Sequence, residues 1–152
     1  VGKALVEENF DKGNPWNQDL LSVQRLAKDD KRIIRLGFVP TEDLVLIYNL
    51  ATVFAMPSIY EGFGLPILEA MSCGTSVVTS KGGSLSEVAG DAAFFVDQYD
   101  IDSIANGIGE VFFTEKLRMS LVQSGFEQAK KFSWRKTAAD TIRVYEKVLE
   151  KQ

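Results

Sequence analysis

The sequence contains no histidine and only one cysteine, Cys73. Without histidine, the chain lacks the commonest general base near neutral pH and the commonest ligand of transition metals. A Ser-His-Asp or Cys-His catalytic site is therefore excluded, and any proton transfer must use Asp, Glu, Lys, Tyr or water. A single cysteine allows no disulfide within the chain, which fits a reducing compartment such as the cytoplasm.

Long apolar runs and an excess of positive charge are also missing. No stretch approaches the roughly 18 consecutive apolar residues that are needed to cross a bilayer. The 17 basic residues are outnumbered by 21 acidic ones, and this net charge of −4 argues against binding to a nucleic-acid backbone. We therefore expect neither a membrane span nor a nucleic-acid partner, and 152 residues suffice for one domain.

Short apolar runs alternate with helical patterns along the chain. Runs rich in β-branched and aromatic residues predict strands over 33–39, 53–57, 75–80 and 92–96, with helices between and after them. This alternation predicts an α/β fold, a Rossmann-like parallel sheet with helices on both faces. Because Val1-Gly2-Lys3 reads like the end of a strand, we expect the first strand and helix of the domain to be missing.

The helices are predicted over about 20–27, 41–51, 66–73, 84–90, 101–113, 115–131 and 134–149. Ser84 and Glu87 have the spacing of a capping box at the start of a short helix, and a ligand contact by Glu87 is the alternative interpretation. Asp100-Ile101-Asp102 also opens a helix, so we interpret these carboxylates as caps and not as metal ligands. Apolar positions such as Ile142 and Val148 predict that the last helix is buried against the domain.

The stretch from Pro57 to Gly74, PSIYEGFGLPILEAMSCG, joins a strand end, a turn with two glycines and a helix start. In parallel sheets, ligands bind at the carboxyl ends of strands, beside the N-termini of the helices that follow. Gly62 and Gly64 would let the turn adopt unusual backbone angles and let a ligand approach its amides, and Pro66 suits a first helical turn. These features predict a site for a phosphate or diphosphate.

Two carboxylates flank this predicted anion site. Glu61 precedes the turn, and Glu69 lies about one helical turn beyond Pro66. Carboxylates repel phosphate but accept hydrogen bonds from hydroxyl groups, and a nucleotide diphosphate sugar carries hydroxyls on both sides of its diphosphate. Glu69 would bind a ribose diol and Glu61 a sugar hydroxyl. A tight strand-to-helix connection without a ligand is the alternative interpretation.

The same residues resemble the signature of the group 1 retaining glycosyltransferases. The resemblance lies in Glu61-Gly62-Phe63-Gly64-Leu65-Pro66, Glu69-Ala70-Met71, Gly74, the VVTS strand, LGFVP, Gly82-Gly83, GDAAFFVD and FSWRKTA, and so covers essentially the whole chain. It implies that residues 1–152 are the C-terminal, donor-binding domain of an enzyme with the two-Rossmann-domain GT-B architecture. That enzyme would transfer a sugar from a nucleotide diphosphate sugar to an acceptor hydroxyl.

The resemblance also implies the roles of individual residues. Glu69 would contact the donor ribose, and Glu61, as the catalytic carboxylate, would lie near the donor sugar. The turn would face the sugar and phosphate through Gly62, Phe63, Gly64 and Leu65. At the end of the first predicted strand, a nucleobase contact is expected from Phe38, Val39 and Pro40. Gly82-Gly83 either borders the donor cleft or forms a plain loop.

The donor is then the substrate, and neither a metal nor another cofactor is required. The acceptor, a glycan, lipid or small molecule, would be held by an N-terminal domain that this chain lacks. The family's diphosphate-binding Arg and Lys would lie upstream of Val1, so the chain alone should bind donor weakly and transfer little or nothing. The cytoplasm is the expected location, with the inner face of the membrane as a peripheral alternative.

Other interpretations stay open. A flavodoxin-like module that binds nucleotides or partners without transfer activity is one, although it would need no pair of glutamates. Another is a different GT-B enzyme, such as a sugar-nucleotide epimerase with histidines outside this segment. In GT-B enzymes the terminal helix often crosses towards the partner domain, and its apolar positions would then be exposed.

Overall fold

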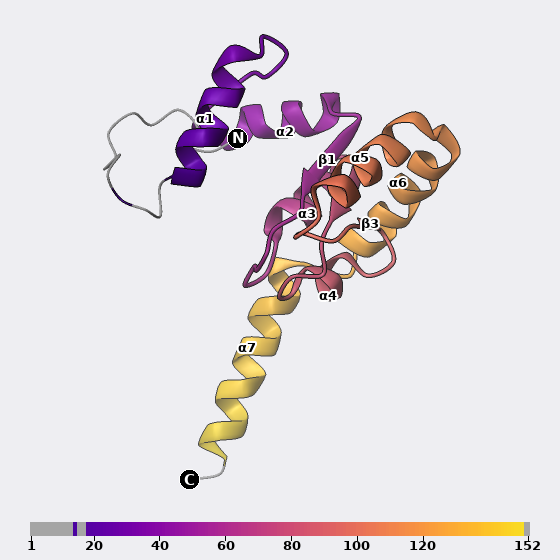
Figure 1. The fold of residues 1–152 in the computed structure, drawn as a ribbon. Helices are drawn as coiled ribbons and strands as arrows, with labels where there is room; N and C mark the ends of the chain where they lie inside the picture. The colour runs from indigo at the N-terminus through magenta and orange to yellow at the C-terminus, as the bar shows by residue number, and fades with distance from the viewer. Residues whose placement is uncertain (1–13, 15–17, 151–152) are drawn as a thin grey trace. The chain divides into compact units, whose positions relative to one another are not determined.

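The computed structural model describes residue 14 and residues 18–150 (Figure 1). The chain forms two compact units, Val1–Leu44 and Val45–Gln152, and each is described here by itself. In the first unit, helix α1 spans Gln18–Asp29, close to the predicted bounds. The strand end expected at residues 1–3 lies outside the described residues. Helix α2, Thr41–Leu50, begins in the first unit and continues into the second.

The second unit is built on a parallel sheet of three strands in the order β1-β2-β3. Its strands are β1 (Val53–Met56), β2 (Ser76–Thr79) and β3 (Phe94–Phe95). Helix α3 (Leu65–Ser72) connects β1 to β2, and helix α4 (Leu85–Ala89) connects β2 to β3. Parallel neighbours joined by helices are the Rossmann-like arrangement that the sequence predicts, so this prediction is confirmed.

Helices cover both faces of this sheet. Val53 and Val78 belong to the apolar core that includes Val111 of helix α5 (Ile101–Phe113) and Leu121 of helix α6 (Glu115–Ala129). Phe54, the neighbour of Val53, meets Tyr48 of α2 with ring centroids 5.4 Å apart. Because successive side chains of a strand point to opposite faces, α5 and α2 lie on opposite sides of the sheet.

Strand β2 is buried along its whole length, and hydroxyl side chains in and beside it bond to the segment around β1. The donors and their backbone acceptors are Thr75 to Tyr48, Ser76 to Thr52, Thr79 to Met56 and Ser80 to Ser58. A buried hydroxyl is costly unless it is hydrogen-bonded. All four bonds therefore satisfy polar groups in the core, and those to Met56 and Ser58 also fix the chain that leaves β1.

The prediction of a strand over 33–39 is wrong, because the structure has no strand there. Ile34 and Leu36 are exposed. A β-strand exists only when its backbone is paired with a neighbour, and among the described residues no strand pairs with this segment. The apolar run by itself could not reveal whether such a neighbour is present.

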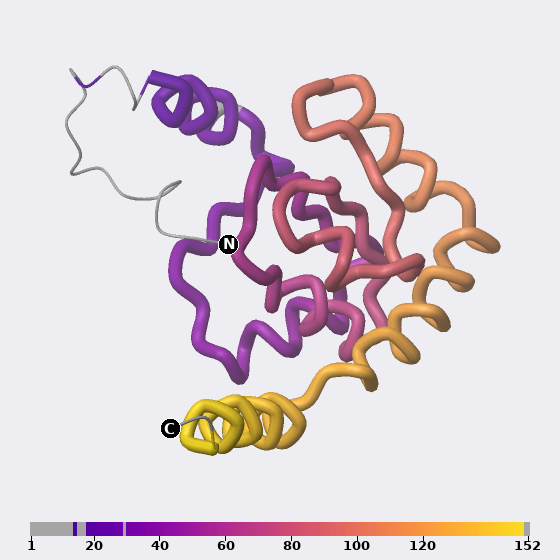
Figure 2. The backbone as a smooth tube through the Cα atoms, turned by 90° about the horizontal axis from the view of Figure 1, so that it is seen from below, coloured from indigo at the N-terminus to yellow at the C-terminus, as the bar shows by residue number. Residues whose placement is uncertain are grey.

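Helix α7, Trp134–Leu149, has no buried residue, so the prediction that it is buried is also wrong. Figure 1 shows this yellow helix extending away from the sheet of its own unit, and Figure 2 shows the same helix nearly end-on. The apolar side chains on it are largely exposed, at 55% for Ile142, 66% for Tyr145 and 55% for Val148. In the part of the chain that the structure describes, no helix is long and apolar enough to span a membrane.

Candidate functional site

The turn between β1 and α3 has its sharpest bend at Gly64. This residue is the N-cap of α3 and has φ 98° and ψ 41°, which is the left-handed region. The backbone angle favours glycine, and a Cβ atom built there would lie 2.7 Å from Cδ2 of Leu85 and would displace that side chain. No side chain caps the first turn of α3, and Pro66 lies in that turn. The helix therefore begins with an uncapped, electropositive end.

Gly62 has a different reason to be glycine. Its φ lies outside the left-handed region, so the unusual backbone angle that was expected in this turn is found at Gly64 and not at Gly62. A Cβ atom built on it would meet no atom within 4 Å. The surface above Gly62 is therefore open, which is what close approach of a ligand to the backbone requires.

Glu61 is held just before this turn by its side chain and its backbone. The Ser58 hydroxyl donates a hydrogen bond of 3.0 Å to Oε1 of Glu61. The Glu61 carbonyl accepts from the backbone N–H of Ser84 at 3.2 Å and lies 3.1 Å from the Ser84 hydroxyl. These contacts come from β1's own loop and from the start of α4, so the position of Glu61 depends on two connections of the sheet.

Ser84 does not form the predicted capping box. It occupies the N-cap position of α4 but makes no side-chain cap hydrogen bond. Its hydroxyl is within hydrogen-bonding distance of the carbonyls of Glu61 and Phe63, at 3.1 and 2.9 Å. The physical reason for the error is that the turn after β1 offers acceptors close to Ser84, which the local spacing to Glu87 cannot reveal.

The glycine pair before Ser84 packs directly against the segment that carries Glu61. A Cβ atom on Gly82 would overlap the carbonyl of Ile59, and one on Gly83 would overlap the carbonyl of Glu61. Gly83 also has φ 60°, in the left-handed region. The loop after β2 is therefore a support for the turn, a role that sequence reasoning missed. The only signal for it was the Gly-Gly pair itself.

Glu69 lies on α3 with an exposed side chain. The Tyr48 hydroxyl donates to its Oε2 at 3.1 Å. Burial, and then the charge of Glu69, raise the pKa of Tyr48, so this phenol stays a donor across the physiological range. The ion pairs among the described residues involve Asp30, Glu127 and Asp140, and neither Glu61 nor Glu69.

The remaining turn residues are accessible. Phe63 and Leu65 are both exposed, and the Phe63 ring meets Phe132 edge-on with centroids 6.0 Å apart. Of the three residues expected at a nucleobase, Phe38 is 74% exposed, Pro40 is exposed and Val39 is half-buried. They belong to the first unit, so their proximity to the turn stays a prediction.

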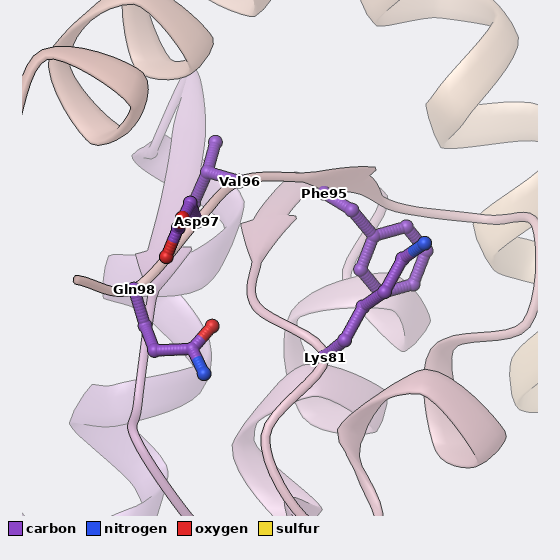
Figure 3. Close-up of a pocket in the computed structure, with 5 residues that line it drawn as sticks. All are labelled: Lys81, Phe95, Val96, Asp97 and Gln98. Atoms are coloured by element: carbon purple, nitrogen blue, oxygen red, sulfur yellow. The ribbon is translucent and has the colours of Figure 1, made fainter. Parts of the chain in front are cut away.

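A shallow depression of about 380 Å³ lies at the carboxyl ends of β2 and β3 (Figure 3). Its lining consists of Lys81, Phe95, Val96, Asp97 and Gln98. The ammonium group of Lys81 lies 5.7 Å from the centroid of the Phe95 ring, within the range of a cation–π interaction. None of the predicted site residues lines this depression.

Asp100 has the capping role that the sequence predicts. Its Oδ1 accepts from the backbone N–H of Asp102 at 2.9 Å, at the start of α5. Within the described residues, no group of three or more Cys, Asp or Glu side chains could hold a metal ion. The independence of the activity from metals stays a prediction.

The fold agrees with that of known proteins. The structure resembles a sucrose-phosphate synthase from Thermosynechococcus elongatus, with a TM-score of 0.78 and 26% identity over 93% of this chain and 37% of that one. It also resembles the C-terminal domain of a group 1 glycosyl transferase, LpcC, from Francisella tularensis, with a TM-score of 0.63 and 28% identity over 78% of this chain and 64% of that one. This is the fold of a GT-B glycosyltransferase domain.

Residues 15–128 match the family described as Glycosyl transferases group 1, and the chain belongs to this family. It is 45% identical to O-antigen chain mannosyltransferase B of Escherichia coli over 132 residues, which are 86% of this chain and 34% of that protein. It is 38% identical to the MMP alpha-(1->4)-mannosyltransferase of Mycolicibacterium hassiacum over 71% of this chain and 27% of that protein. The chain thus spans about a third of these relatives or less.

Proposed function

We propose that this chain is the donor-binding domain of a retaining glycosyltransferase that moves a hexose from a nucleotide diphosphate sugar to an acceptor hydroxyl. The acceptor is held by another part of the full-length protein, and no metal takes part. The chain by itself binds the donor weakly and transfers little or no sugar. The activity belongs to the cytoplasm, in solution or at the inner face of the membrane.

The observation that carries this proposal is the state of the two carboxylates. Each accepts a hydrogen bond from a neutral hydroxyl, Glu61 from Ser58 and Glu69 from Tyr48, and neither is paired with an Arg or Lys among the described residues. Between them in the sequence are Gly62, whose surface is open, and the uncapped N-terminus of α3. Anion-binding amides flanked by unpaired carboxylates suit a ligand with a central diphosphate and hydroxyls on both sides.

In the proposed reaction, the chain's residues act on the two ends of the bond that breaks. Glu61 orients the donor sugar and stabilises the positive charge that develops at its anomeric carbon. The first turn of α3 holds the departing diphosphate through its backbone amides and dipole, and Glu69 fixes the nucleotide by its ribose. Such preorganised charges act most strongly where charge develops in the transition state.

The relatives narrow the proposal further. The names of two of them specify mannosyl transfer, which favours mannose as the transferred hexose. The similar Francisella structure is a C-terminal domain, which supports the same position for this chain in its full-length protein.

Replacing Glu69 by Ala should weaken donor binding by about tenfold to a hundredfold, because a hydrogen bond to a charged group contributes about 1.5–3 kcal/mol. The chain is titrated with UDP, GDP and ADP sugars by calorimetry or by NMR. We expect the wild type to prefer one nucleotide, with a dissociation constant from about 100 μM to the millimolar range.

Glu127→Ala is the control for this titration, because Glu127 is an exposed glutamate of α6 that pairs with Lys130. It should bind the donor like the wild type. No response of the wild type to any of the three sugars would overturn the proposed donor site and favour a non-catalytic interaction module.

Replacing Gly62 by Ala should lower donor affinity by about tenfold while the free energy of unfolding changes by less than about 0.5 kcal/mol. The added methyl would have no contact within 4 Å among the described residues, so we expect it to obstruct a ligand without disturbing the fold. The same titration and a urea unfolding curve measure the two effects. Unchanged affinity in a normally folded variant would show that the ligand does not approach the turn at this residue.

A further inference from the structure

Tyr48 is a buried tyrosine whose hydroxyl reaches the exposed carboxylate of Glu69. It lies on α2 with only 6% of its surface exposed, and its ring packs against the edge of Phe54. The hydroxyl donates to Oε2 of Glu69 at 3.1 Å, across 21 residues of sequence. A buried aromatic side chain thus ends in one polar contact, and that contact is with a residue of the proposed site.

The backbone of Tyr48 is also fixed. Its carbonyl accepts a hydrogen bond from the hydroxyl of Thr75, a buried residue that precedes β2. The tyrosine is therefore held at its carbonyl by the sheet region and at its ring by Phe54. Since both ends of the residue are held, its hydroxyl is a rigid reference point for whatever it contacts.

The hydrogen bond from Tyr48 fixes the orientation of the Glu69 carboxylate. A glutamate on a helix surface has three rotatable bonds and samples several rotamers. The Tyr48 hydroxyl donates its hydrogen bond to Oε2 of Glu69, and among the described residues no cation is paired with this carboxylate. Oε1 is thus left to accept from a ligand. Because the carboxylate is already held in one orientation, less side-chain conformational entropy is lost when the ligand binds.

The packing of Tyr48 does not require its hydroxyl. A phenylalanine would fill the same space against Phe54, and it would carry no polar group that burial penalises. The reason for a hydroxyl at this position is therefore the hydrogen bond that it donates to Glu69. Burial and the Glu69 charge raise the pKa of Tyr48, which keeps the phenol protonated as a donor.

We propose that Tyr48 is a positioning residue, which orients the Glu69 carboxylate through its hydroxyl so that the ribose of the nucleotide is bound by its 2′- and 3′-hydroxyl groups. The proposal rests on the donor-binding function given above. Tyr48 would not itself touch the ligand. The Tyr48–Glu69 pair would allow the domain to discriminate ribose from deoxyribose.

The test uses Tyr48→Phe, which removes one oxygen and keeps the ring. Dissociation constants are measured by calorimetry for whichever of UDP, GDP and ADP the wild type binds best, and for its 2′,3′-dideoxy analogue. Loss of the hydrogen bond between Tyr48 and Glu69 should weaken binding of the ribonucleotide by about fivefold and leave binding of the dideoxy analogue almost unchanged. In a Glu69→Ala background, Tyr48→Phe should have no further effect. Tyr145→Phe, at an exposed tyrosine of α7, should match the wild type.

The possible failures can be told apart. Equal weakening of the ribonucleotide and the dideoxy analogue would overturn the positioning role, because a loss of packing affects both. Full ribonucleotide affinity in Tyr48→Phe, while Glu69→Ala binds weakly, would overturn it and leave the donor site standing. Absence of nucleotide binding by the wild type would overturn both proposals.

Discussion

Replacing Glu61 by Gln in the full-length enzyme should lower kcat by about a hundredfold, the usual size of the loss when one preorganised electrostatic group is removed. Glutamine keeps the length of the side chain and an oxygen that can accept from Ser58, which now bonds to Oε1 at 3.0 Å. The variant therefore removes the negative charge and leaves the local geometry. Steady-state sugar transfer and the dissociation constant of the donor measure the effect on turnover and on binding.

Glu127→Gln is the matched control for this change, since it neutralises an exposed carboxylate that pairs with Lys130 on α6. Its kcat should stay within about twofold of the wild-type value. A Glu61→Gln enzyme that keeps its kcat and loses only donor affinity would assign Glu61 to binding and would refute its proposed role in stabilising developing charge.

Replacing Gly83 by Ala should reduce the free energy of unfolding by about 3 kcal/mol. The residue has φ 60°, which is unfavourable for alanine, and the new Cβ would overlap the carbonyl of Glu61 and lie 3.0 Å from the Glu61 nitrogen. The overlapping atoms cannot move freely, because the same carbonyl accepts from Ser84. The urea midpoint should therefore fall, and the part of the chain that must shift carries Glu61.

Gly109→Ala provides the contrast, because Gly109 lies inside helix α5 and a Cβ there would meet no atom within 4 Å. That variant should be more stable than the wild type by about 0.5–1 kcal/mol, as alanine favours a helix. If Gly83→Ala instead unfolds at the wild-type midpoint, the loop after β2 does not support the turn as the structure indicates.

The elements that sequence reasoning predicted well are those whose signals are local. The bounds of α5 and α7 agree with the structure, and α3 ends where expected, with Gly74 at φ 76°. The backbone there closes with bonds from Gly74 to Met71 and from Thr75 to Ala70, which make a Schellman motif. Helix caps and apolar periodicity involve residues only a few positions apart, so they can be recognised from the sequence of one segment.

The features that were predicted wrongly depend on contacts between segments that are far apart in the sequence. Among the described residues, no strand lies beside residues 33–39, and none of the side chains of α7 is buried. Ser84 bonds to carbonyls 21 and 23 residues away. Each outcome depends on what lies beside the segment in space, and its own residues allow either result.

For the candidate site, the identity of the chemical groups came from the sequence by itself: two glutamates, a turn with glycines, and a helix N-terminus. The tertiary structure decided how those groups are held, through Ser58 at Glu61, Tyr48 at Glu69, and the Gly82-Gly83 loop behind the turn. The physical reason is range, since a side chain's chemistry belongs to its own residue, whereas its direction is set by donors and steric contacts from distant parts of the chain.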